Sequence, residues 1–204
     1  MAGSVTTIRP AQATIADGRA YASFADQAAD GLFRWMLGPR FVDIVARAFV
    51  SPGHDQSYEY ASFAEDGGTA VGMLSGYSSQ QHARSGDGAL LAAARWRAPR
   101  VVSTWLVAYP VMRFMDRLPA GDWYVQTVAV DPARRGQGIG STLLDLAEET
   151  ARAAGASRLV LDVVVANEGA RRLYERRGMV AEARSPSLPY LSGTALDRMV
   201  LTLS

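Results

Sequence analysis

The sequence contains no cysteine and only two histidines, His54 and His82, among its 204 residues. Without cysteine there is no disulfide, no thiolate metal ligand and no cysteine nucleophile. Two isolated histidines do not make a histidine-rich metal site, so we expect no metal cofactor. Lysine is absent as well: all 21 basic residues are arginine, which excludes Schiff-base chemistry and a lysine base.

A strong net charge and a long apolar run are also missing. The formal net charge is +1, which gives no strong positive field for binding nucleic acid. The longest apolar-rich stretch, 101–115, contains Pro110 and Arg113 and is shorter than the ~20 residues of a membrane span. Residues 1–10 lack the charged-then-apolar pattern of a signal peptide. We therefore expect a cytoplasmic protein that binds neither membranes nor nucleic acid.

The length fits one domain, 1–204, which can bury roughly 70% of the surface of its unfolded chain. Apolar periodicity, interrupted by glycine and proline, predicts helices at 17–29 and 41–50 and strands at 58–64 and 69–77. The acidic and glycine residues 65–68 suit a hairpin turn between these two strands.

Residues 78–121 form a segment that is longer than an ordinary connection. Helices are predicted at 89–97 and 101–117, so we expect a helical insert that walls the acceptor site. The insert carries six arginines and two aspartates, which favours an acceptor with an apolar or carboxylate-bearing body over a polycation. It also carries the aromatic residues Trp96, Trp105, Tyr109 and Phe114. The alternative is that these belong to an ordinary core or to a homodimer contact.

The C-terminal half has a clearer pattern. A strand is predicted at 123–130, an amphipathic helix at 138–154, a strongly apolar strand at 158–165 and a second helix at 168–177. A last strand is predicted at 195–203. Strand–helix–strand order predicts two parallel strands joined by a right-handed crossover.

A glycine-rich turn lies between the first of these strands and its helix, in the run Val-Ala-Val-Asp-Pro-Ala-Arg-Arg-Gly-Gln-Gly-Ile-Gly at 128–140. Its backbone N–H groups and the first helical turn form an anion site suited to a phosphate or pyrophosphate. The alternatives are a glycine turn without a ligand, a Rossmann dinucleotide site and a methyltransferase-like loop. The Rossmann spacing differs, and only 64 residues follow Gly140, too few to complete either of those folds.

Two blocks of the sequence resemble the GNAT acetyltransferase superfamily. Residues 135–140, Arg-Gly-Gln-Gly-Ile-Gly, resemble its Q/R-x-x-G-x-G/A signature. Residues 167–178, Asn-Glu-Gly-Ala-Arg-Arg-Leu-Tyr-Glu-Arg-Arg-Gly, are similar to its N-x-x-A-x-x-x-Y-x-x-x-G segment. The resemblance implies an α/β fold of GNAT type: a mixed central sheet with helices on both faces and a helical insert before the cofactor-binding strand.

The resemblance also implies a cofactor, acetyl-CoA, and the residues that bind it. The backbone of Val128, Ala129 and Val130 is expected to hold the pantetheine arm and the thioester. The residues expected at the pyrophosphate are Arg135, Gly136, Gln137, Gly138 and Gly140. Asn167 matches a position that often contacts the cofactor arm, and it equally suits the cap of the helix that follows.

Tyr174 matches the frequent general acid of the family. Attack by an amine on a thioester expels a thiolate, which a nearby phenol can protonate. The alternative is a core tyrosine, because Ala170, Leu173 and Tyr174 line one face of the predicted helix.

The general base is not identified by the sequence. Many relatives carry a glutamate on the strand before the glycine turn, where this chain has Gln126, and glutamine cannot accept a proton at neutral pH. Asp122, Asp162 and a chain of water molecules are the alternatives. The simpler interpretations are a turn residue for Asp122 and a solvated or helix-paired acid for Asp162.

These observations together predict an acetyl-CoA-dependent N-acyltransferase. It is expected to transfer an acetyl group to an amine of a small-molecule acceptor by direct attack on the thioester. The alternative is a non-catalytic CoA-binding or regulatory module on the same fold, which Gln126 favours and Tyr174 disfavours.

Overall fold

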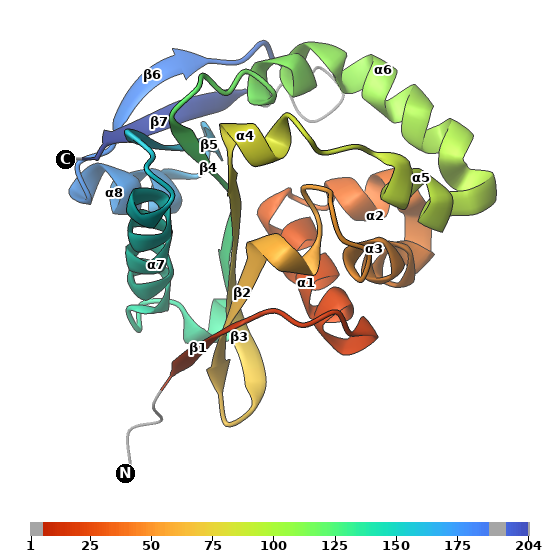
Figure 1. Cartoon of the computed structure of the whole chain (residues 1–204), viewed down its shortest axis with the longest axis horizontal. Coiled ribbons are helices and arrows are strands. Elements are labelled where there is room, and N and C mark those ends of the chain that lie inside the picture. Colours follow the sequence, from red (N-terminus) through yellow and green to blue (C-terminus); the bar gives the residue numbers. More distant parts are fainter. Residues whose placement is uncertain (1–5, 188–194, 204) are drawn as a thin grey trace.

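The computed structural model describes residues 6–187 and 195–203, and its centre is a seven-stranded mixed sheet (Figure 1). The strands lie in the order β1-β2-β3-β4-β5-β7-β6. Their bounds are β1 Thr7–Pro10, β2 Ala61–Asp66, β3 Thr69–Ser78, β4 Asp122–Val130, β5 Arg158–Val164, β6 Val180–Arg184 and β7 Leu196–Thr202. All neighbouring strands pair antiparallel except β4 and β5, which pair in parallel as the sequence predicts.

Helices cover both faces of the sheet, so the predicted layering is confirmed (Figure 1). The helices are α1 Ile15–Ala28, α2 Leu32–Leu37, α3 Phe41–Phe49, α4 Ser79–His82, α5 Gly88–Ala94, α6 Ala98–Met115, α7 Ile139–Ala153 and α8 Glu168–Arg176. Short 3-10 turns lie at Gly38–Arg40, Tyr58–Tyr60, Arg95–Arg97 and Pro132–Arg134. Helices α7 and α8 lie on one face, and α1 to α6 lie on the other. In the part of the chain that is described, no helix is both long and apolar enough to cross a membrane.

Two cores form because side chains alternate along each strand. Phe63 of β2 and Met73 of β3 are fully buried against α1 and α3. Their neighbours Ala64 and Leu74 are buried on the opposite face, against α7. This period of two places a packed helix layer against each side of the central strands.

Strands β4 and β5 pair over only part of their length. Asp122–Val125 lies beside 158–161, but β4 continues to Val130 and β5 to Val164. Beyond Val125 the two strands separate, while β4 stays paired with β3 as far as Val130. The separation opens an edge of β4 next to the glycine turn.

The insert consists of α4, α5 and α6. Helix α6 contains Pro99 in its first turn and Pro110 in its interior. Its C-terminal end is tied to the sheet, because Arg198 of β7 donates to the carbonyls of Phe114 (3.0 Å) and Met115 (3.2 Å). The predicted helices of this segment are therefore confirmed, with the break between them at Arg95–Arg97.

Several elements differ from the sequence prediction. Strand β2 begins at Ala61 rather than at 58, because Ser57 caps a 3-10 turn over Tyr58–Tyr60. Helices α2 and α4 and strand β6 were not predicted. Strand β6 is exposed at all five positions, so it lacks the alternating pattern by which a strand is predicted.

The contact of α1 with β1 makes stability depend on pH. Arg9 donates to both carboxylate oxygens of Asp17 (2.7 and 2.8 Å), and the Gln12 amide donates a third bond (2.7 Å). These bonds, that from Arg9 above all, outweigh burial and hold the pKa of Asp17 below its ordinary value. A lowered pKa stabilises the fold at pH values above the unfolded-state pKa, and this stabilisation is lost as pH falls through the folded-state pKa.

We therefore expect the free energy of unfolding to fall less between pH 5 and 3 in Asp17→Asn than in the wild type. Urea unfolding at a series of pH values measures this. Asp43→Asn is the control, because the Asp43 side chain is 46% exposed in its pair with Arg19. An identical pH dependence in the wild type and in Asp17→Asn would contradict the assignment.

Candidate functional site

The site begins at the edge of β4 that β5 leaves open. The expected pantetheine residues Val128, Ala129 and Val130 lie on this stretch, paired on their other side with β3. The carbonyl of Val130 already accepts a hydrogen bond from Gln27 of α1 (3.1 Å). The Asp131 amide donates to the Val71 carbonyl, so by the alternation of an antiparallel pair Ala129 also bonds to β3, and the N–H and C=O of Val128 face the open edge.

The glycine turn connects this edge to α7. Gly136 and Gly138 have φ values of 76° and 84°, a left-handed conformation that L side chains rarely adopt. A Cβ at either position would meet no atom within 4 Å, so backbone conformation requires the glycines and the space beside them is open. A ligand can thus approach the backbone closely, as the anion-site interpretation requires.

The turn carries positive character from two sources. Gly138 is the N-cap of the 15-residue helix α7 and has no side chain with which to satisfy the first N–H groups of the helix. Arg135 is exposed and makes no ion pair within the described residues, whereas Arg134 is paired with Asp66 of β2 (2.5 Å). Arg135 is therefore the arginine of the pair that is left to contact an anion. Gln137 is exposed beside it.

Asn167 caps helix α8. Its side-chain oxygen accepts a hydrogen bond from the Ala170 amide (3.1 Å), which confirms the capping interpretation. A contact between Asn167 and a cofactor arm stays a prediction.

The arginines of α8 are mostly engaged in ion pairs. Arg171 pairs with Asp197, Arg172 with Glu168 (3.0 Å), and Arg177 contacts both Asp145 (2.5 Å) and Glu148 (2.6 Å). These three arginines are therefore held by carboxylates of the chain itself.

Tyr174 lies on α8 and is 8% exposed, within the core between α7, α8 and the sheet. Burial raises the pKa of its hydroxyl to about 12, so the hydroxyl is protonated at neutral pH and can act as a donor. No hydrogen bond engages that hydroxyl within residues 6–187 and 195–203. Tyr174 packs as a core residue, and its role as an acid stays a prediction.

Gln126 is held in place on the face that α1 covers. Its side-chain oxygen accepts hydrogen bonds from the Tyr21 hydroxyl (3.1 Å) and the Ser75 hydroxyl (3.2 Å). Both donors are buried. Gln126 is therefore a fixed polar group that cannot take up a proton.

The two aspartates considered as bases are both in tight ion pairs. Asp122 is 2% exposed and accepts two bonds from Arg158 (2.7 and 2.8 Å), at the end of β4 far from the separation of the strands. Asp162 accepts bonds from Arg198 (2.9 and 2.8 Å) and from the Tyr124 hydroxyl (3.1 Å). Each carboxylate is thus occupied by a permanent cation.

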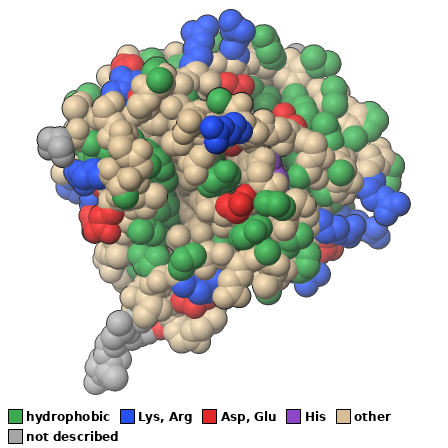
Figure 2. Space-filling model, in the orientation of Figure 1, with side chains coloured by type: hydrophobic (Ala, Val, Ile, Leu, Met, Phe, Trp, Pro, Cys, Tyr) green, Lys and Arg blue, Asp and Glu red, His purple; other side chains and the backbone are tan. Residues whose placement is uncertain are grey.

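The preference of the insert for an acceptor with an apolar or carboxylate-bearing body stays a prediction, and two of its six arginines are bonded to another helix. Arg97 donates to the carbonyl of Leu37 (3.0 Å) and Arg100 to that of Met36 (3.1 Å), so both are directed to α2. The two aspartates of the insert lie instead toward His82, which acts electrostatically on both. Figure 2 shows the wider pattern, with acidic and basic side chains interspersed over this face.

The aromatic residues of the insert have different surroundings, and their place in a wall of the acceptor site stays a prediction. Trp96 is 76% exposed and Tyr109 is 56% exposed. The rings on the relevant face of the sheet are those of Tyr77 and Tyr124, which are buried with centroids 5.7 Å apart. Two adjacent strand tyrosines were not singled out from the sequence, because only the three-dimensional pairing of β3 with β4 brings them together.

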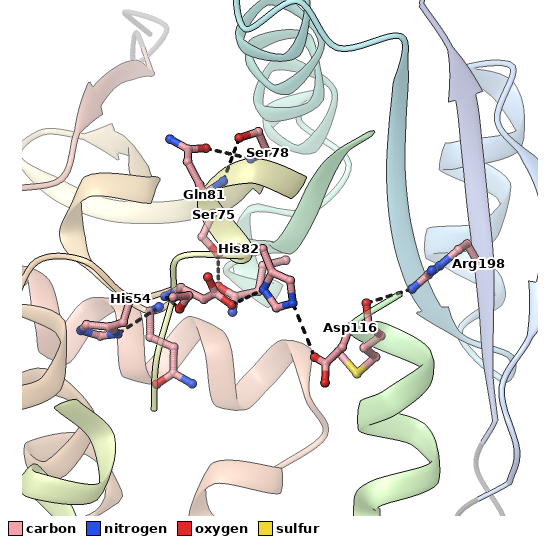
Figure 3. A network of polar contacts seen from close by, with 12 residues as sticks. His54, Ser75, Ser78, Gln81, His82, Asp116 and Arg198 are labelled. Carbon is pink, nitrogen blue, oxygen red and sulfur yellow. Dashed lines mark hydrogen bonds and ion pairs between the residues drawn. The ribbon is translucent and has the colours of Figure 1, made fainter. Parts of the chain in front are cut away.

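His82, at the end of α4, joins these rings to a group of carboxylates (Figure 3). Its Nδ1 lies 2.6 Å from the Asp55 carboxylate, and its ring stacks on Tyr77 with centroids 5.4 Å apart. Asp116, at the C-terminal end of α6, lies on the other side of the imidazole. This arrangement was not predicted, because its members come from three separate segments of the chain.

Comparisons with known proteins identify a matching family and several similar folds. A family model described as Acetyltransferase (GNAT) family matches residues 29–179. A solved acetyltransferase is 25% identical and has a TM-score of 0.67, with 97% of this chain and 100% of that chain covered. An N-acetyltransferase from Staphylococcus aureus Mu50 is 16% identical, with a TM-score of 0.64 and coverage of 96% and 100%.

The Salmonella typhimurium protein yncA, solved with its cofactor acetyl-CoA, is 21% identical, with a TM-score of 0.54 and coverage of 98% and 95%. A search of curated protein sequences found no match. The structural matches confirm the predicted fold.

Proposed function

The chain belongs to the acetyltransferase (GNAT) family, and we propose that it transfers an acetyl group from acetyl-CoA to an amine of a small-molecule acceptor. The observation that carries the proposal is the separation of β4 from β5 directly before a glycine turn and helix N-terminus. A strand edge accepts an extended amide chain, and the turn accepts phosphates. Few ligands combine both features, and acetyl-CoA does.

In this proposal the two parts of the site bind the two parts of acetyl-CoA. The backbone of Val128, together with the amide of Val130, pairs with the pantetheine arm and orients the thioester, and the carbonyl of Val130 stays with Gln27. The pyrophosphate lies at the turn, in the open space beside Gly136 and Gly138. The groups that complete the phosphate subsite are Arg135, Gln137 and Gly140, which lies in the first turn of α7.

The amine attacks the thioester carbon directly, so no covalent enzyme intermediate forms. Backbone N–H groups near Val128 stabilise the oxyanion, which is usually the largest single contribution of a site of this kind. As the C–S bond breaks, Tyr174 supplies a proton to the leaving sulfur. Asn167 holds the start of α8, the helix that carries Tyr174.

Release of free thiol from acetyl-CoA, measured with a broad panel of amines, tests the proposal. Amine-dependent thiol release together with an acetylated product supports it. Tight binding of acetyl-CoA without transfer to any amine would favour a CoA-binding or regulatory module instead. A cytoplasmic location belongs to the same proposal.

Tyr174→Phe is expected to lower kcat about 10²-fold with little change in acetyl-CoA affinity. The substitution removes only a hydroxyl, and the remaining ring still fills the core. Stopped assays of thiol release give kcat, and calorimetry gives the affinity. Tyr109→Phe is the matched control, because the Tyr109 hydroxyl is on the exposed side of α6. An unchanged kcat in Tyr174→Phe would return this residue to a purely structural role.

A further inference from the structure

At neutral pH an amine acceptor is protonated, and it has no lone pair for attack until it loses that proton. Gln126 cannot accept it, and Asp122 and Asp162 are each bound by an arginine at two points. Removing an arginine from such a pair is costly, so neither carboxylate is free to cycle protons. The alternatives are therefore a chain of water molecules or another side chain on the same face of the sheet.

The contacts of His82 fix the position of its imidazole, as a general base requires. Its Nδ1 is 2.6 Å from Asp55 Oδ2, and the ring lies nearly parallel to Tyr77, at an interplanar angle of 9°. A partner on one ring nitrogen fixes the orientation and tautomer of the imidazole. Its Nε2 is 3.8 Å from Asp116, too far for a hydrogen bond. The side chain is 24% exposed and its Nδ1 is bonded to Asp55, so Nε2 is the nitrogen left for a substrate.

The position of His82 connects it to the proposed reaction centre. Tyr77, on which it stacks, is paired with Tyr124 of β4. Gln126 lies two residues further along β4 and therefore on the same face as Tyr124. Figure 3 shows the imidazole between Asp116 and the group around Ser75, which is the hydrogen-bond partner of Gln126. The pairing of β4 with β5 ends at Val125, next to Tyr124, so the imidazole lies over the face of β4 close to where the strands separate.

We propose that His82 accepts the proton of the acceptor amine through Nε2, and that Asp55 is the positioning residue that orients it. This inference rests on the proposed acetyl transfer. It names the base of that reaction, which the sequence left open.

The reaction balances in the following steps. The ammonium gives one proton to His82 Nε2, and its lone pair forms the N–C bond to the thioester carbon. The C–S bond breaks, its electron pair goes to sulfur, and the sulfur takes the Tyr174 proton. The second proton of the new amide nitrogen returns to Tyr174 through water, and His82 releases its own proton to solvent.

Acidic groups come close to His82 from three separate elements. Asp55 comes from the loop before β2, Asp87 from the start of α5 and Asp116 from the end of α6, while Tyr77 of β3 lies under the ring. Burial raises the pKa of both Asp87 and Asp116, and Asp55 adds to each shift. Carboxylates on three sides attract an approaching ammonium.

The test compares His82→Ala and Asp55→Asn with the wild type and with Gln80→Ala, an exposed position on the same short helix. The acceptor is the best substrate from the amine panel that stays protonated between about pH 5.5 and 8.5. Wild-type kcat/KM should fall as pH is lowered, because a protonated imidazole accepts no proton. His82→Ala should lose about 10²-fold in kcat/KM and lose this acidic limb. Added imidazole should restore part of its rate and leave Gln80→Ala unchanged.

Acetyl-CoA affinity and the thermal transition are measured for every variant. A folded His82→Ala that binds acetyl-CoA and keeps the wild-type rate and pH profile would overturn the inference while the proposed function stands. If His82→Ala does not fold, the isosteric Asp55→Asn decides, and an unchanged pH profile in it overturns the inference. A wild type that transfers acetyl to no amine removes both proposals together.

Discussion

Gly138→Glu is expected to abolish binding of acetyl-CoA, with an affinity loss of more than about 100-fold, or about 2.7 kcal/mol. The residue starts α7 at a φ of 84°, so a side chain there costs the backbone about 1–2 kcal/mol. The larger effect is electrostatic. A carboxylate would stand at the helix N-terminus, where the phosphates are proposed to bind, and two anions repel. Isothermal calorimetry with acetyl-CoA measures the loss.

Gly155→Glu is the matched control. Gly155 follows the other end of α7, has a φ of 70°, and a Cβ there would also meet no atom within 4 Å. The backbone strain is therefore comparable, but the new charge lies a full helix length from the turn. Equal acetyl-CoA affinity in the Gly138 and Gly155 variants would show that the phosphate subsite is elsewhere.

Arg198→Met should destabilise the fold by about 3–5 kcal/mol, the cost of leaving a buried charge without its partner. The side chains of Arg198 and Asp162 are 7% and 1% exposed. Without the guanidinium, Asp162 keeps only the bond from Tyr124, and the last carbonyls of α6 lose their donor. Urea unfolding, followed by far-UV circular dichroism, gives the change in free energy.

Arg172→Met is the control, because Arg172 is exposed and pairs with Glu168 one helical turn away. Such a pair contributes at most about 0.5 kcal/mol. The double variant Arg198→Met with Asp162→Asn should recover part of the loss, since the buried charge is gone. A loss in Arg198→Met no larger than that in Arg172→Met would mean that α6 is held by its apolar contacts.

The C-terminal half could be predicted from the sequence because its signals are local. Gly138 and Asn167 each stand at a helix start, and the apolar run of β5 has no competing interpretation. Strand β6 and helix α2 were missed for the opposite reason. Strand β6 is exposed along its length, so no alternating apolar pattern marks it. Only the folded structure shows that it pairs with β7.

The candidate site, too, was predictable only where its signals are local in the sequence. Glycine spacing indicates a left-handed turn, which Gly136 and Gly138 form, while their contact with a phosphate stays a prediction. Side-chain constellations are encoded by the fold, and His82 meets Asp55 and Tyr77 only after three segments pack together. The summed charge of the insert carries no direction, and only the structure shows that Arg97 and Arg100 donate to the carbonyls of another helix.

The ion pairs that hold the sheet and its helices, Arg9–Asp17, Arg158–Asp122 and Arg198–Asp162, all use guanidinium groups. A guanidinium stays protonated at every physiological pH and offers no nucleophilic lone pair to a thioester. The chain has no lysine, so its side chains present no amine of the kind that the proposed reaction consumes. Acyl transfer from a bound thioester to the protein's own side chains therefore cannot neutralise the cations of these ion pairs.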